Sequence, residues 1–178
     1  MGEAQIKDKL ADYKQVIETN LENLFEEDSI PPELKQAMQY SLSAGGKRLR
    51  PVLCLAWGQH FGMQMEKILD FATSLELIHT YSLVHDDLPA MDNDDYRRGK
   101  PSNHIRFGES TAILAGDALL TEAFRLMLLN DLPPDRVRRA AAEVAAATGA
   151  RGMVGGQVMD MNLFKVADPG FEALKQMH

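Results

Sequence analysis

The sequence contains a single cysteine, Cys54, which excludes an internal disulfide and suits a reducing compartment. It lies among apolar residues at helical spacing, so we expect it in the core. No apolar run approaches the roughly 20 residues that cross a bilayer, and the start, MGEAQIKDK, lacks the hydrophobic region of a secretion signal. A net charge of −7 disfavours nucleic acid as a partner. We therefore expect a cytoplasmic protein without stable membrane insertion.

Sustained period-2 alternation is also absent, whereas apolar residues at helical spacing recur between proline and glycine breaks. The pattern predicts helices over residues 3–27, 32–43, 51–61, 65–87, 110–130, 138–147 and 171–178, and a polar loop over 97–104. Such a series is typical of an all-α bundle, here a single helical domain over 1–178. The last helix stops in mid-pattern without a cap, so we expect the chain to be the N-terminal part of a longer protein.

One acidic stretch, HTYSLVHDDLPAMDNDDYRR (79–98), carries five aspartates within ten residues. Asp86 and Asp87 follow an apolar helix, where unpaired carboxylates are costly, and Pro89 lets the chain fold Asp92 back toward them. Crowded carboxylates repel one another, and Mg²⁺ relieves that repulsion while sharing phosphate oxygens with a substrate. The adjacent arginines are suited to phosphate. A metal–diphosphate site is favoured over the alternative, a solvated acidic loop.

A basic stretch, AGGKRLRP (44–51), lies before the next expected helix. Its two glycines allow close backbone approach to a ligand, and three basic side chains lie beside a helix start, whose free N–H groups attract anions. A solvated basic turn is the alternative. Because the chain is acidic overall and has a second anion-seeking cluster at 97–98, we favour anion binding.

Four motifs share a common order and spacing with one enzyme family: GGKRLRP at 45–51, DDLPAMD at 86–92, RRGKPSNH at 97–104 and GGQVMD at 155–160. Together they resemble the trans-isoprenyl diphosphate synthases, all-α prenyltransferases that make geranyl, farnesyl and geranylgeranyl diphosphate. The four residues between the second and third aspartates are similar to the bacterial farnesyl type. The resemblance implies the N-terminal portion of an isoprenoid-synthase-type helical bundle, a Mg²⁺ cofactor and a homodimer. It also implies condensation of isopentenyl diphosphate with dimethylallyl or geranyl diphosphate to farnesyl diphosphate.

The resemblance also implies roles for individual residues. Asp86 and Asp92 would bind Mg²⁺ on the allylic diphosphate, with Asp87 supporting them. Arg97 and Gln157 would hold the same diphosphate. Four residues would hold isopentenyl diphosphate, namely Lys47, Arg50, His79 and Arg98.

His79 has an alternative role, because a lone histidine on an apolar helix is usually a core residue. It lies two turns before Asp86 on the same helix face, which favours the ligand role. The next histidine along this helix, His85, faces elsewhere, and we expect it to be structural.

Product length is predicted from helix geometry. Tyr81 and Ser82 lie five and four residues before Asp86, about 6–7.5 Å along the axis. A prenyl tail that grows away from the diphosphate would meet the Tyr81 ring, which predicts a farnesyl product.

Three other functions stay open: a geranylgeranyl-type synthase, a non-catalytic helical partner subunit, and a metal-dependent phosphohydrolase using His85, Asp86 and His60. The family's lysine–threonine pair and second aspartate-rich motif are not in these 178 residues. We therefore expect this polypeptide alone to be inactive.

Overall fold

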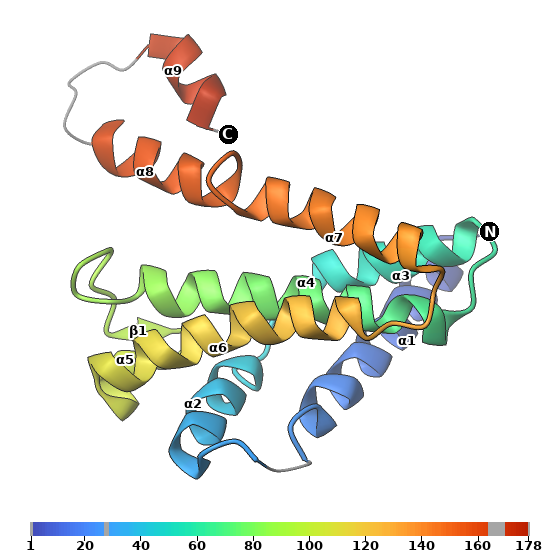
Figure 1. Cartoon of the computed structure of the whole chain (residues 1–178), viewed down its shortest axis with the longest axis horizontal. Coiled ribbons are helices and arrows are strands. Elements are labelled where there is room, and N and C mark those ends of the chain that lie inside the picture. The colour runs from blue at the N-terminus through green and yellow to red at the C-terminus, as the bar shows by residue number, and fades with distance from the viewer. Residues whose placement is uncertain (1, 27–28, 164–169, 178) are drawn as a thin grey trace. The chain divides into compact units, whose positions relative to one another are not determined.

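A computed structural model describes residues 2–26, 29–163 and 170–177 (Figure 1). Within these residues there are nine helices and one two-stranded hairpin, so the predicted all-α fold is confirmed. The chain divides into two compact units, Met1–Asp131 and Leu132–His178.

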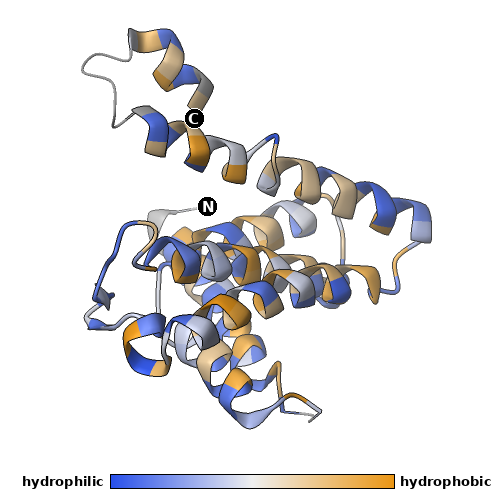
Figure 2. Ribbon diagram, turned by 60° about the vertical axis from the view of Figure 1, so that its left-hand side comes forward, coloured by the Kyte–Doolittle hydropathy of each residue, from blue (hydrophilic) through white to orange (hydrophobic). Residues whose placement is uncertain are grey.

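The first unit is organised around one long helix, α4 (Met65–Asp86), which packs against α6 (Glu109–Leu128) and α3 (Leu49–His60). The remaining helices of the unit are α1 (Glu3–Asn23), α2 (Pro32–Leu42) and α5 (Asn103–Phe107). Both α1 and α2 contact α4 as well. Figure 2 shows hydrophobic and hydrophilic residues within single helices, as expected of amphipathic segments around a core. Fully buried members of this core include Ile17, Leu21, Met38, Leu42, Leu55, Leu77, Leu119 and Met127.

The buried surface of α4 includes polar side chains, and these have partners. Ser74 Oγ lies 2.7 Å from the Asp70 carbonyl and 2.9 Å from the Ala123 carbonyl of α6. Thr73 Oγ1 accepts a 2.7 Å hydrogen bond from Asn20 on α1. Because these polar groups are satisfied, α4 can be enclosed by neighbouring helices without a large desolvation cost.

The contact between α4 and α6 requires a glycine. A Cβ atom at Gly116 would overlap the His85 ring, and His85 Nε2 lies 3.0 Å from the Ile113 carbonyl on α6. His85 is therefore used in helix packing, as the sequence predicts.

The predicted polar loop at 97–104 is wrong in part. Strands β1 (Tyr96–Arg97) and β2 (Lys100–Pro101) pair antiparallel, and α5 follows at once. Arg98 and Gly99, at the turn, have φ of 53° and 78°, which is the left-handed pair of a type I′ turn. The two-residue strands are too short for an alternating pattern to reveal.

The second unit contains α7 (Pro134–Thr148), α8 (Met153–Leu163) and α9 (Gly170–Met177). Helix α7 begins four residues before the predicted start, because Pro133 and Pro134 initiate it rather than merely precede it. Within α8 lie Gly155 and Gly156. Among the described residues, none of the helices combines the length and apolarity needed to cross a membrane.

Candidate functional site

The acidic loop after α4 turns back on the end of that helix. The helix ends at Asp86, and the Asp92 amide donates a 2.9 Å hydrogen bond to the Asp86 carbonyl. The Leu88 carbonyl accepts bonds from the amides of Met91 (2.9 Å) and Asn93 (3.1 Å). The predicted return of Asp92 after Pro89 is confirmed.

Negative charge is crowded at Asp86. Its partial burial, followed by the nearby charge of Asp92, raises the pKa of its carboxyl group. Across residues 2–26, 29–163 and 170–177, no three His, Cys, Asp or Glu side chains are grouped to hold a metal by themselves. Mg²⁺ commonly uses one or two carboxylates, with water and substrate phosphates completing the shell. The Asp86–Asp92 pair fits that donor set.

Asp87 has a different environment from Asp86. It is only 2% exposed, and its Oδ1 accepts a 2.8 Å hydrogen bond from Arg97 Nε and a second from Nη2. This bond raises the pKa of the Arg97 guanidinium. Arg97 Nη2 also lies 3.4 Å from Asp94. Asp87 therefore fixes Arg97, and the hairpin that carries it, beside the acidic loop.

A basic cleft lies farther back along α4. Its volume is about 530 Å³, and it is lined by the four predicted isopentenyl diphosphate ligands Lys47, Arg50, His79 and Arg98. They come from the loop after α2, the first turn of α3, the middle of α4 and the hairpin turn. The structure thus brings together residues that are up to 51 positions apart in the sequence.

Positive charge in the basic cleft is only partly compensated. Burial, followed by the charge of Arg50, lowers the pKa of His79, while Glu76 acts in the opposite direction. Burial and the charge of Arg48 likewise lower the pKa of Arg98. Such mutual repulsion among cations makes an anion a favourable occupant.

The acidic loop and the basic cleft lie on the same helix. His79 and Asp86 are seven residues apart on α4, or roughly 10 Å along the axis. Consecutive arginines connect the two regions, because Arg97 binds Asp87 while Arg98 donates a hydrogen bond to the Gly45 carbonyl.

The remaining predicted residues have diverse environments. Tyr81 is buried, and its ring meets the His85 ring edge-on, with 5.6 Å between the ring centroids. Ser82 Oγ donates a 2.9 Å bond to the His79 carbonyl. Gln157 is partly buried on α8, in the second unit, and its role stays a prediction. Cys54, predicted to lie in the core, is only partly buried, and its burial raises the pKa of the thiol to about 11.

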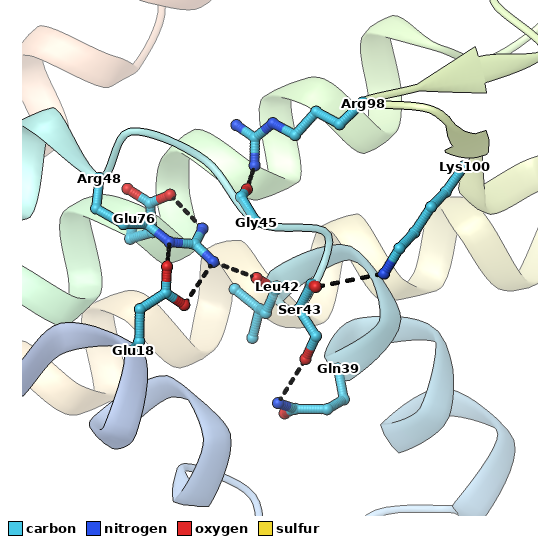
Figure 3. A network of polar contacts seen from close by, with 9 residues as sticks. All are labelled: Glu18, Gln39, Leu42, Ser43, Gly45, Arg48, Glu76, Arg98 and Lys100. Atoms are coloured by element: carbon cyan, nitrogen blue, oxygen red, sulfur yellow. Dashed lines mark hydrogen bonds and ion pairs between the residues drawn. The ribbon is translucent and has the colours of Figure 1, made fainter. Parts of the chain in front are cut away.

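Sequence reasoning missed the role of Arg48. It grouped Arg48 with the other basic residues of 44–51, but the side chain is buried and paired with Glu18 and Glu76 (Figure 3). Glu76 was the available indication, because an acid within an apolar helix requires a partner.

The fold and site define an all-α protein with a carboxylate loop and a basic cleft on one central helix. The profile of the polyprenyl synthetase family matches residues 31–178. The chain belongs to this family, as its four motifs predict.

Similar proteins and a similar crystal structure support the assignment to this family. The chain is 50% identical over 155 residues to the farnesyl diphosphate synthase of Bacillus subtilis, covering 85% of this chain and 52% of that protein. It is 46% identical over 171 residues to the geranylgeranyl diphosphate synthase of Cyanophora paradoxa, covering 95% and 57%. The crystal structure of a geranyltransferase from Legionella pneumophila superposes with a TM-score of 0.95 at 40% identity, covering 99% of this chain and 64% of that one. The chain thus spans about half the length of these curated relatives.

Proposed function

We propose that the protein to which this chain belongs condenses isopentenyl diphosphate with dimethylallyl or geranyl diphosphate to form farnesyl diphosphate. The observation that carries the proposal is the grouping of Lys47, Arg50, His79 and Arg98 around one cleft, on the helix that ends at Asp86. The two regions have opposite charge, which suits two diphosphates that must be treated differently.

The acidic loop binds the allylic diphosphate. Asp86 and Asp92 would hold Mg²⁺, which when bound supplies positive charge for the departing diphosphate. Asp87 holds Arg97 beside this position through its hydrogen bonds. Arg97 then adds a fixed cation where negative charge develops as the carbon–oxygen bond breaks.

The basic cleft binds isopentenyl diphosphate. Its cations bind the diphosphate without metal, so this ester stays intact while its double bond supplies electrons. Those electrons form the new carbon–carbon bond with the allylic cation, and a proton then leaves the resulting cation. The released diphosphate is the proposed proton acceptor, and no side chain of the chain is assigned as base.

The farnesyl product rests on Tyr81 and on the spacing of the DDLPAMD motif. Tyr81 is buried one to two turns before Asp86, where a growing prenyl tail would meet its ring. A geranylgeranyl product is the second candidate, because one of the similar relatives is named as a geranylgeranyl diphosphate synthase.

Several further properties belong to the same proposal. We propose a cytoplasmic homodimer in which residues 1–178 act as one helical domain. This polypeptide alone is expected to be inactive, since a second aspartate-rich motif is not among its residues. A non-catalytic partner subunit and a phosphohydrolase are the alternatives.

The test compares this chain with a protein extended to the length of its relatives. Labelled isopentenyl diphosphate and geranyl diphosphate are supplied with Mg²⁺, and prenyl products and free phosphate are measured separately. The proposal expects farnesyl diphosphate from the extended protein and none from its Asp86→Asn variant. Phosphate release without a new carbon–carbon bond would indicate a phosphohydrolase, and no turnover by the extended protein would indicate a non-catalytic subunit.

A further inference from the structure

Arg48 lies between two ligands of the basic cleft, yet its side chain is turned into the protein. Its guanidinium is fully enclosed and donates to Glu18 Oε1 (Nε, 2.9 Å), Glu18 Oε2 (Nη2, 3.1 Å) and Glu76 Oε1 (Nη1, 2.7 Å). Nη2 also donates to the Leu42 carbonyl at 2.6 Å, at the end of α2. These bonds connect α1, α2 and α4 to the first residue before α3 (Figure 3).

The backbone at Arg48 is unusual for a residue other than glycine. Its φ of 50° and ψ of 33° are left-handed, a conformation that is unfavourable for a residue with a Cβ atom. The turn sends Arg48 inward, while Lys47 and Arg50 on either side stay exposed. The buried hydrogen bonds of the guanidinium offset this cost and hold the turn.

We propose that Arg48 is a positioning residue: it fixes the loop that presents Lys47 and Arg50 to the diphosphate of isopentenyl diphosphate. The inference rests on the proposed function of the basic cleft. Arg48 itself is not assigned to the diphosphate, because its guanidinium is fully enclosed and four of its five N–H groups donate to Glu18, Glu76 and Leu42.

The other end of the loop is held as well. Arg98 donates to the Gly45 carbonyl and Lys100 donates to the Ser43 carbonyl at 3.5 Å. A Cβ atom at Gly46 would lie 2.8 Å from Arg98 Nη1, so the loop and the hairpin are in close contact. The loop is therefore fixed by the hairpin at one end and by Arg48 at the other.

A variant that removes the charges around Arg48 can distinguish a positioning role from a purely electrostatic effect on diphosphate binding. Arg48, Glu18 and Glu76 together carry a net charge of −1, and Glu76 lines the basic cleft. A variant with all three neutralised, Arg48→Met/Glu18→Gln/Glu76→Gln, leaves no buried charge without a partner, and such replacements are often tolerated. If only the charge mattered, this variant would bind diphosphate more tightly, since a net negative charge is removed. If Arg48 positions the loop, the variant binds diphosphate more weakly.

The experiment titrates this chain with isopentenyl diphosphate in a calorimeter, in magnesium-free buffer containing a chelator. We expect the triple variant to bind at least about tenfold more weakly than the parent chain, the cost of one misplaced charge-assisted hydrogen bond. A second variant, Arg48→Lys, keeps the charge but not the planar fork, and it too is expected to bind more weakly. Thermal unfolding of each variant is measured beside the titration.

Met127→Ala is the matched control, because it removes a fully buried side chain of α6 that does not line the basic cleft. It should lower the melting temperature and leave the affinity unchanged. Parent-like affinity of Arg48→Lys, or of a folded triple variant, would overturn the positioning role while leaving the proposed function intact. Failure of the parent chain itself to bind would instead contradict the proposed function of the basic cleft, and the positioning role with it.

Discussion

The Asp92 amide donates a 2.9 Å hydrogen bond to the Asp86 carbonyl, so the acidic loop is closed by its own backbone. The closure brings the Asp92 charge near enough to raise the pKa of Asp86, in addition to the effect of burial. The fold of the loop itself therefore crowds the negative charges.

Neutralising Asp92 should consequently lower the pKa of Asp86. A carbon-detected NMR titration of the Asp carboxyl groups in Asp92→Asn measures this shift. Asp95→Asn is the control, because Asp95 is an exposed aspartate of the same loop and is not one of the main charges that shift the pKa of Asp86. An equal shift in both variants would show that the effect is general and not due to the closed loop.

The raised pKa of Asp86 also makes the free energy of unfolding depend on pH. Because the pKa of Asp86 is raised in the folded state, the folded chain binds this proton more tightly than the unfolded chain does. Its contribution to the free energy of unfolding is therefore lost as pH rises from the ordinary value of 3.8 through the raised value. Mg²⁺ should shift the apparent pKa downward, since the ion competes with the proton.

His79 provides a pH-dependent measure of the basic cleft. Arg50 contributes to its lowered pKa, so Arg50→Gln should raise the pKa of the imidazole. Inorganic pyrophosphate should also raise it in the parent chain, since an anion stabilises the imidazolium. Proton NMR of the ring measures both effects. Arg106→Gln, at an exposed arginine of α5, is the control, and a pyrophosphate shift that survives Lys47→Met/Arg50→Gln would place the anion elsewhere.

The packing of α4 on α6 gives a prediction independent of function. Gly116→Ala should destabilise the chain by about 1–3 kcal/mol, because the new Cβ atom overlaps the His85 ring. In a His85→Ala background the same change should stabilise by about 0.5–1 kcal/mol, through the higher helix propensity of alanine. Urea unfolding of the four proteins measures the difference. The same sign in both backgrounds would contradict the proposed contact.

Replacing Tyr81 by Ala should lengthen the product, because the buried ring closes the path of the prenyl tail in the proposed site. Product chromatography of the extended protein measures chain length. Phe107→Ala, at an aromatic residue of α5 whose ring contacts Tyr40 of α2, is the control. An unchanged product from Tyr81→Ala would remove Tyr81 as the length determinant.

The sequence predicted those features that depend on local patterns. Helical spacing located most of the helices, and the proline after Asp86 and Asp87 predicted the return of Asp92. The resemblance to a family predicted four ligands of isopentenyl diphosphate. That these four residues line one cleft is a tertiary property, which sequence spacing alone cannot predict.

What the sequence did not predict depends on long-range pairing. Arg48 resembles its neighbours in sequence, and only the approach of α1 and α4 shows that it faces Glu18 and Glu76. The sequence did not predict the hairpin at 96–101 for a similar reason. Its strands have two residues each, and they are held by contacts such as the bond from Arg98 to Gly45.

The most direct test of the central claim is a crystal structure of this chain with isopentenyl diphosphate and Mg²⁺. The account predicts the diphosphate of this ligand in contact with Lys47, Arg50 and His79, with no metal ion bridging it. A diphosphate bound through Mg²⁺ at Asp86 and Asp92, with the basic cleft left without ligand, would contradict the assignment of the two sites.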